Sequence, residues 1–269
     1  MLPTAKDWLN RLAAESRSAQ LDHLDVLFDC ATLPASLLAS LLELTPAPAC
    51  AWLFEQTPEH ELAHQGPVLL RIALASEEQR AGLLQLLGAV HDKFCVLAII
   101  SRWPFADLAA HLRAATQATW SKGACCGVLR YYDTRLFRHL CDQLDPHQRG
   151  LFHAPVIQWN WIDHDGKAAT YSGFDFRQDP QNVLSGMSVT DEQVLHMQSV
   201  SAALQWFKDY GKRPGEHGFT SREAMVFWLI TVHLDINRKK LETWRHQDFI
   251  ASALSELRSL TLTGNGGGL

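Results

Sequence analysis

The sequence predicts an α/β fold in its amino-terminal half, followed by a small all-helical lobe. Between residues 23 and 144, short apolar runs typical of strands alternate with longer segments of helical periodicity. Two of these runs, residues 94–100 and 124–129, are apolar on both faces, which is typical of strands inside a largely buried sheet. Beyond residue 189 the periodicity is helical throughout. We therefore expect a mixed sheet flanked by helices, and then a separate group of helices.

The elements of the amino-terminal part follow from this alternation. The first 20 residues have the pattern of an amphipathic helix. Strands are expected at residues 23–30, 50–54, 68–73, 94–100 and 124–131, and helices at 34–44, 77–90, 105–119 and 134–144. A further short helix is expected after Thr57-Pro58-Glu59, which resembles an N-cap with a proline in the first turn. Gly66-Pro67 should end it after about two turns.

The remaining chain divides into three parts. Residues 155–162 and 167–171 should pair as a hairpin around the turn Asp163–Gly166, with a polar connector at 173–188. Thr190 with Gln193 and Thr220 with Glu223 fit capping boxes that open two helices, and a less regular helical region covers 237–260. The predicted organisation is an α/β domain (1–150), a hairpin and linker (151–188), a helical lobe (189–262) and a disordered tail (263–269).

Composition narrows the functional classes. The chain has 269 residues and a net charge of −5, so no basic surface for nucleic acid is implied. Charged residues interrupt the first segment where a signal peptide needs an apolar core, and the longest uncharged apolar run, near 224–232, is much shorter than the roughly 20 residues that span a membrane. None of the six cysteines forms a C-x-x-C pair. We expect a soluble cytoplasmic protein with reduced, mostly buried thiols.

One short stretch suggests metal chemistry. His60-Glu61-Leu62-Ala63-His64 fits the H-E-x-x-H pattern, in which two histidines on one face of an α-helix hold zinc and the glutamate activates the bound water. The predicted helix is short, however, and the sequence fixes no third ligand near it. A zinc-dependent hydrolase using His60, Glu61 and His64 is therefore the alternative function. The main expectation is that the chain holds neither a metal nor a cofactor, because no phosphate-binding or nucleophile motif is present.

A second polar cluster follows an apolar strand and opens a helix. In Arg130-Tyr131-Tyr132-Asp133-Thr134-Arg135, Asp133 is placed to cap the helix, and Arg130 and Arg135 can join it in a charge network. The ends of strands are where α/β proteins tend to place functional groups. The pattern fits a ligand site, and it fits equally well a helix cap with ion pairs that stabilise the turn between strand and helix.

Several motifs in order resemble the adaptor, or chaperone, family of bacterial type VI secretion systems, whose conserved domain was long known only as one of unknown function. The likeness covers about residues 22–161. The stretch from Leu53 to Pro67 matches the family form L-F-x-x-T-P-E-x-x-L-A-x-x-G-P, and the stretch from Arg130 to Leu136 matches R-[FY]-Y-D-x-R-[LVF]. In this pattern His60 and His64 fall on variable positions. The resemblance therefore implies that the match to the zinc motif is a coincidence and that the segment has a structural role.

The resemblance implies a function without catalysis. Members of that family bind a specific toxic effector in the cytoplasm and load it onto the spike protein of the secretion tube, and the effector is usually encoded nearby. The expected partners are these two proteins, with no nucleic acid or membrane. Arg130, Tyr132, Asp133 and Arg135 are the expected shared interaction surface. The helical lobe is rich in aromatic residues, and Trp206 and Trp228 are candidates either for a cargo groove or for plain core packing.

Overall fold

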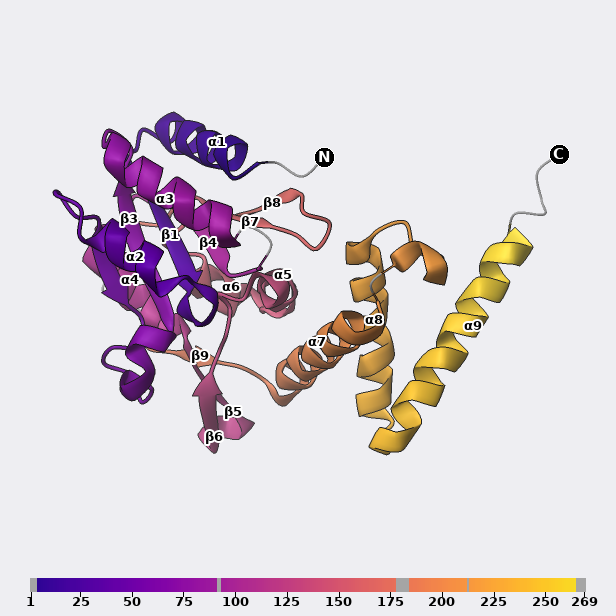
Figure 1. Cartoon of the computed structure of the whole chain (residues 1–269). Coiled ribbons are helices and arrows are strands. Elements are labelled where there is room, and N and C mark those ends of the chain that lie inside the picture. Colours follow the sequence, from indigo (N-terminus) through magenta and orange to yellow (C-terminus); the bar gives the residue numbers. More distant parts are fainter. Residues whose placement is uncertain (1–3, 91–92, 178–183, 212, 265–269) are drawn as a thin grey trace. The chain divides into compact units, whose positions relative to one another are not determined.

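The computed structural model describes residues 4–90, 93–177, 184–211 and 213–264, with side chains as far as residue 257. The chain forms two compact units, residues 1–190 and residues 191–269. The first holds all the strands described below, and the second is helical (Figure 1). An α/β amino-terminal part followed by helices is the fold class that the sequence predicts, and the structure confirms it.

The first unit is built on a six-stranded sheet in the order β2-β3-β1-β4-β7-β8. Its strands are β1 (His23–Asp29), β2 (Ala49–Trp52), β3 (Pro67–Ala73), β4 (Val96–Ile100), β7 (Gln158–Ile162) and β8 (Ala168–Ser172). All five neighbouring pairs are antiparallel. The predicted hairpin of residues 155–171 therefore contributes two strands to the main sheet and is not a segment apart from it.

Alternation of strands and helices does not produce parallel neighbours here, for a topological reason. Strand β3 and strand β4 are joined by helix α3 (Glu77–Val90), as in a β-α-β unit, but β1 lies between them and is antiparallel to both. This is a split β-α-β arrangement. The sequence of a strand, a helix and a second strand has the same pattern whether the two strands are neighbours or a third strand lies between them. The pattern alone therefore does not predict which strands pair.

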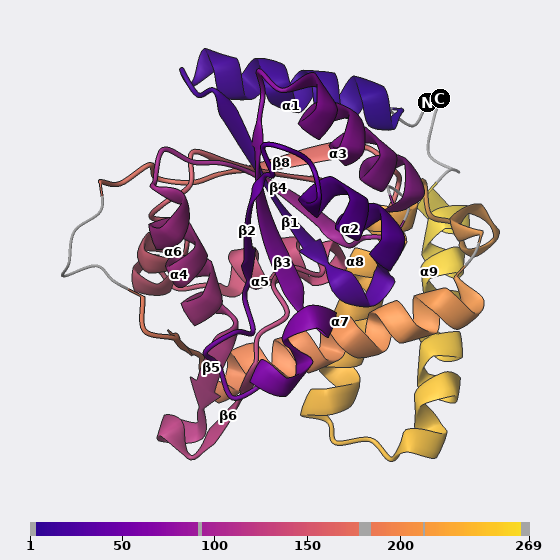
Figure 2. The same ribbon diagram turned by 60° about the vertical axis from the view of Figure 1, so that its left-hand side comes forward.

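Helices cover both faces of the sheet (Figure 2). Helices α1 (Ala5–Ser18), α2 (Ala35–Leu42) and α3 pack on one face, where Trp8, Leu38 and Leu83 join the alternate strand residues Val26 and Leu70 in one buried cluster. Helices α4 (Phe105–Ala115) and α6 (Pro146–Phe152) lie on the opposite side. The capping box of α1, between Thr4 and Asp7, fixes where the first helix begins.

The second face has an aromatic core. Phe137 of α5 (Thr134–Gln143) and Phe152 of α6 pack on Trp159 of β7, with ring centroids 5.1 and 5.5 Å apart. The indole Nε1 of Trp159 donates to His153 Nδ1 at 2.8 Å. Because all four side chains are buried, the hairpin that carries Trp159 is anchored to the helices of this face.

Some elements differ from the prediction. The helix expected at 105–119 ends at Ala115, and the next residues form β5 (Gln117–Trp120), which pairs with β6 (Cys125–Val128) and with β9 (Met187–Ser188) in a small separate sheet. The pairing of β5 with β9 is parallel. Helix α6 was not predicted, although its capping box of Asp145 and Gln148 and its Pro146 in the first turn are signals for it.

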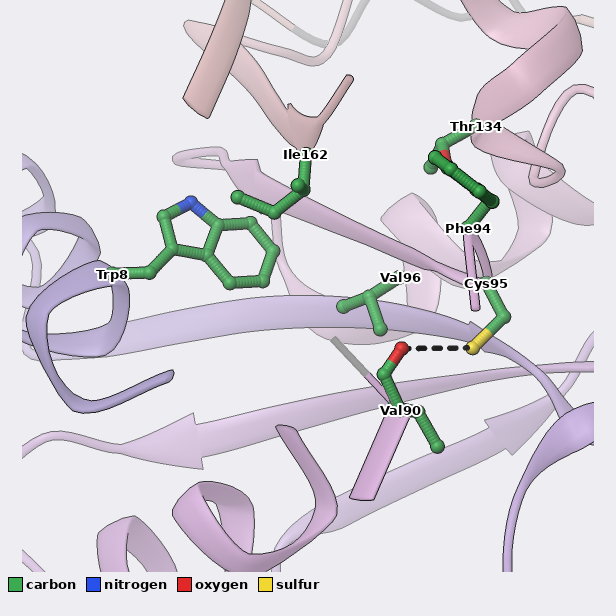
Figure 3. A pocket seen from close by; sticks show the side chains of 7 residues that line it. All are labelled: Trp8, Val90, Phe94, Cys95, Val96, Thr134 and Ile162. Atoms are coloured by element: carbon green, nitrogen blue, oxygen red, sulfur yellow. Dashed lines mark hydrogen bonds between the residues drawn. The ribbon is translucent and has the colours of Figure 1, made fainter. Parts of the chain in front are cut away.

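A small cavity lies where α1 crosses the sheet (Figure 3). It measures about 10 Å³ and is lined by Trp8, Val90, Phe94, Cys95, Val96, Thr134 and Ile162. Trp8 and Ile162 point toward one another across it. A space of this size holds no more than one water molecule. The cavity is therefore a packing feature, not a ligand pocket.

The second unit consists of α7 (Asp191–Tyr210), α8 (Arg222–Arg238) and α9 (His246–Gly264). Asn237 Nδ2 donates to Ser199 Oγ at 2.8 Å, which ties α8 to α7. Ser221 caps α8, one residue later than the predicted cap Thr220. The region expected at 237–260 is divided, because α8 runs to Arg238 and α9 begins at His246.

The carboxy-terminal tail is partly helical. Of the tail predicted at 263–269, the first two residues end α9, and residues 265–269 lie outside the described residues. In the described part of the chain, no helix is both long enough and apolar enough to cross a membrane.

Candidate functional site: a charged cluster at the end of β1

The predicted cluster forms at one end of the main sheet. The segment Arg130–Arg135 runs from the loop after β6 into the first turn of α5, and it passes the end of β1, whose last residue is Asp29. Thr134 N donates to Phe94 O at 3.1 Å, which holds the start of α5 beside the residues that lead into β4. The site is thus fixed by the strand ends of the sheet and by the first turn of one helix.

Asp133 organises the carboxy-terminal half of the cluster. It is the N-cap of α5, and its Oδ1 accepts from Arg135 N at 3.1 Å. Arg135 also donates from Nε to Oδ1 at 2.9 Å and from Nη2 to Oδ2 at 2.7 Å, so the pair is bidentate. The hydrogen bond to Asp133 is the main cause that raises the pKa of Arg135 above its ordinary value.

Asp29 completes the cluster from the other side. Arg130 Nη2 donates to Asp29 Oδ2 at 3.1 Å and lies 4.0 Å from Asp133 Oδ2. Asp29 also caps the short 3₁₀ helix η1 (Cys30–Thr32) through Ala31 N. Sequence reasoning missed Asp29, although an acidic residue directly after the apolar run of β1 is the signal that marks it.

The cluster exposes its cations and buries its anions. The side chains of Arg130 and Arg135 are 50% and 41% exposed, whereas those of Asp29 and Asp133 are 9% and 5% exposed. Two acidic and two basic groups balance formally. Because the carboxylates lie inside and the guanidinium groups reach solvent, the outer face of the cluster is a surface of N–H donors.

Tyr132, predicted as part of the interaction surface, is buried. The Arg130 guanidinium lies 5.9 Å from its ring centroid, and the ring of Phe54 packs edge-on against it. Burial raises the pKa of Tyr132 to about 12, so the phenol stays protonated. The Tyr132 ring packs against the buried side of the Arg130 guanidinium. Of the four predicted residues, only Arg130 and Arg135 reach the surface.

The segment that carries the HELAH motif lies at the same end of the sheet. Its residues form η2 (His60–Gln65), which contacts η1. Thr57 Oγ1 accepts from Glu59 N at 3.2 Å, as a turn cap does. Gly66 follows η2 and lies against Phe54, so closely that a Cβ there would be 2.2 Å from Phe54 Cδ2. The motif of residues 53–67 therefore packs beside the motif of residues 130–136 through the contact of Phe54 with Tyr132.

The geometry of η2 does not suit the zinc motif. The pattern needs an α-helix, but residues 60–65 form a 3₁₀ helix with an irregular Leu62. In a regular 3₁₀ helix positions i and i+4 lie about 120° apart around the axis, and here the irregular Leu62 also interrupts the helix between His60 and His64, so the α-helical face that the motif needs is not formed. His64 packs edge-on against Trp52 at 4.7 Å. Across the described ranges, no group of three His, Cys, Asp or Glu side chains is arranged to hold a metal ion.

The two candidate tryptophans of the second unit differ. Trp206 is buried and packs against Tyr210, with its Nε1 3.4 Å from Gln247 Oε1. Trp228 is half-buried and lines an open groove of about 410 Å³ between α8 and α9, together with Val232 and Phe249. Trp206 is thus a core residue, and Trp228 belongs to a groove.

Part of the chain is similar to a known family. Residues 26–151, just under half of the chain, match the model of a family described as a domain of unknown function (DUF4123). The match runs from within β1 to within α6, and it includes Asp29 and the whole Arg130–Arg135 segment. No curated protein and no solved structure matches the chain.

Proposed function

We propose that this chain is a non-catalytic adaptor that binds a specific type VI secretion effector in the cytoplasm and loads it onto the spike protein of the secretion tube. The support is a resemblance in ordered motifs together with the match of residues 26–151 to a domain family. Both the similarity and the motifs belong to the first unit.

The observation that carries the proposal is the place where the motifs meet. The motif of residues 53–67 and the motif of residues 130–136 are about 65 residues apart in the chain, yet they pack together at one end of the sheet through Phe54 and Tyr132. Asp29 and Asp133 then hold two half-exposed arginines on the outside. A fixed surface of this kind suits recognition of a protein, because ordered side chains lose little entropy on binding.

The groove between α8 and α9 supports a second role for the helical unit. It combines the apolar side chains of Trp228, Val232 and Phe249 with the polar rim of Asp235 and Lys239. Apolar grooves between helices are a common way to receive a helix or an extended segment of a partner. We propose that cargo recognition differs among relatives through this unit.

The test is affinity purification of the full chain co-expressed with the products of its neighbouring genes. We expect one large partner with a toxin-like domain, or a spike protein, to elute in a stable complex with the chain. Recovery of the chain alone under conditions where it remains folded would contradict the adaptor proposal. Metal analysis of the same sample tests the zinc alternative, which predicts about one zinc ion per chain and loss of hydrolysis in Glu61→Gln.

A further inference from the structure

We infer that the exposed guanidinium groups of Arg130 and Arg135 form a docking site for a carboxylate of a protein partner, supplied by an aspartate or glutamate side chain or by a chain terminus. The inference rests on the proposed adaptor function and adds the chemistry of the contact to it. Neither the family description nor the motif resemblance assigns a ligand to these residues.

The two guanidinium groups lie beside the same buried carboxylate, that of Asp133. The Nη2 atoms of Arg130 and Arg135 lie 4.0 and 2.7 Å from the same oxygen, Asp133 Oδ2. Arg130 donates to Asp29 through Nη2 and also bonds the Tyr132 side chain, and Arg135 donates to Asp133 through Nε and Nη2. Each group has five N–H donors, so further donors of both remain on their exposed edges. A carboxylate arriving from solvent can therefore contact two adjacent arginines.

The charge distribution favours an anion from outside. An approaching carboxylate meets side chains that are 50% and 41% exposed and cationic, before it meets the carboxylates of Asp29 and Asp133, which are 9% and 5% exposed. Planar guanidinium groups match a carboxylate in a bidentate manner. For a dianionic phosphate the attraction of the guanidinium groups and the repulsion of the buried carboxylates both double, since Coulomb energy scales with charge, so charge alone does not distinguish the two anions. The site therefore fits an anion with two oxygens in one plane, and a carboxylate is the group of this kind that a protein partner supplies.

The arginines are also held in place before a partner binds. Asp29 and Asp133 fix one edge of each guanidinium group, and the ring of Tyr132 supports Arg130. Long flexible side chains otherwise lose rotamer freedom at an interface, which opposes binding. Preorganisation removes part of that cost and so opposes the loss of attraction that results from the neutral total charge of the cluster.

The experiment is a selection of displayed random peptides on the immobilised full chain, with counter-selection on the double variant Arg130→Gln/Arg135→Gln. We expect the selected peptides to be enriched in Asp and Glu. Changing their acids to Asn or Gln, or using the double variant, should weaken binding at least about tenfold in fluorescence polarisation, because charge-assisted hydrogen bonds are lost. Peptides that bind without an acid, or no selective enrichment at all, would overturn the inference.

Control variants separate this effect from changes in folding. Arg138→Gln alters another arginine of α5, which is 49% exposed, and should leave peptide binding within about twofold of the original. The double variant Arg130→Lys/Arg135→Lys keeps the positive charges but removes the planar, bidentate donor groups of arginine. We expect its peptide binding to lie between that of the original chain and that of the Gln double variant. Thermal unfolding of each variant checks that it is folded. If inorganic phosphate displaces the peptides at lower concentration than acetate does, the assignment to a carboxylate is wrong.

The outcome is distinguishable from that of the adaptor proposal. If acidic peptides bind through Arg130 and Arg135 but no partner co-purifies with the chain, the carboxylate site stands and the adaptor function fails. If a partner co-purifies equally well with the Arg130→Gln/Arg135→Gln variant, the function stands and this inference fails.

Discussion

Asp25 and Arg71 face each other across β1 and β3 and form a bidentate ion pair inside the first unit. Arg71 donates from Nε to Asp25 Oδ1 and from Nη2 to Asp25 Oδ2, both at 2.7 Å, and Nη2 also bonds Trp103 O at 3.0 Å. Asp25 is fully buried. A charge pair in this position sets the register of the two strands, because a slip of one residue would bury both charges without partners.

Removing one partner of this pair should strongly destabilise the first unit. We expect Arg71→Leu to lower the free energy of unfolding by about 3–5 kcal/mol, since it leaves Asp25 buried without its cation. Urea unfolding followed by tryptophan fluorescence measures the change. Arg11→Ala is the matched control: it breaks the exposed pair with Glu15 and should cost less than about 1 kcal/mol. Equal effects of the two variants would contradict this view of the pair.

Gly66 should not tolerate a side chain. A Cβ at this position would lie 2.2 Å from Phe54 Cδ2, and Phe54 in turn packs on Tyr132. We expect Gly66→Ala to displace Phe54 and to lower the free energy of unfolding by about 1–3 kcal/mol, as overpacking does. Gly88→Ala, at a helical position with open space around it, is the control and should be neutral or slightly stabilising. Calorimetry of both variants makes the comparison, and a harmless Gly66→Ala would refute the packing argument.

The stability of the first unit should fall in mild acid because of two buried histidines. Burial lowers the pKa of His111 to about 4 and of His153 to about 3. The unfolded chain takes up protons near pH 6.5, whereas the folded chain does not, so the stabilising effect is complete above about 6.5 and is lost as pH falls toward 4 and 3. Urea midpoints at pH 7.5 and pH 5 test the direction.

The histidine contribution can be isolated by substitution. His111 Nε2 lies 3.2 Å from Phe152 O, a contact that a glutamine amide can also make. His111→Gln should therefore reduce the loss of stability between pH 7.5 and pH 5. An unchanged loss would mean that other groups cause it.

The two tryptophans of the helical unit should respond differently to truncation. Trp206→Ala should destabilise by about 3–5 kcal/mol, because Trp206 is buried. Trp228→Ala should cost clearly less, since that ring is half-buried beside a groove. Helical circular dichroism during thermal unfolding reports the two losses. A larger loss for Trp228→Ala would place it in the core and remove the groove interpretation.

Local patterns in the sequence predict most of the elements, but not their long-range pairing. Helix α3 begins and ends where its periodicity predicts, and Asp133 is the cap that its position indicates. The contact of Asp29 with Arg130 joins residues 101 positions apart, and no local pattern encodes it. The HELAH segment shows the same limit on a small scale, because its sequence pattern fits an α-helix, whereas its residues form a 3₁₀ helix with an irregular Leu62.

Strands β7 and β8 have a consequence for how this domain can be divided. The similarity to the known family stops at residue 151, but β7 pairs with β4, and Trp159 completes the aromatic packing of Phe137 and Phe152. A fragment ending at residue 151 would leave the edge of β4 open and an apolar surface bare, which favours aggregation through strand pairing. The segment defined by similarity is thus smaller than the compact unit of residues 1–190, and we expect that expression of the first unit needs residues beyond Ser172.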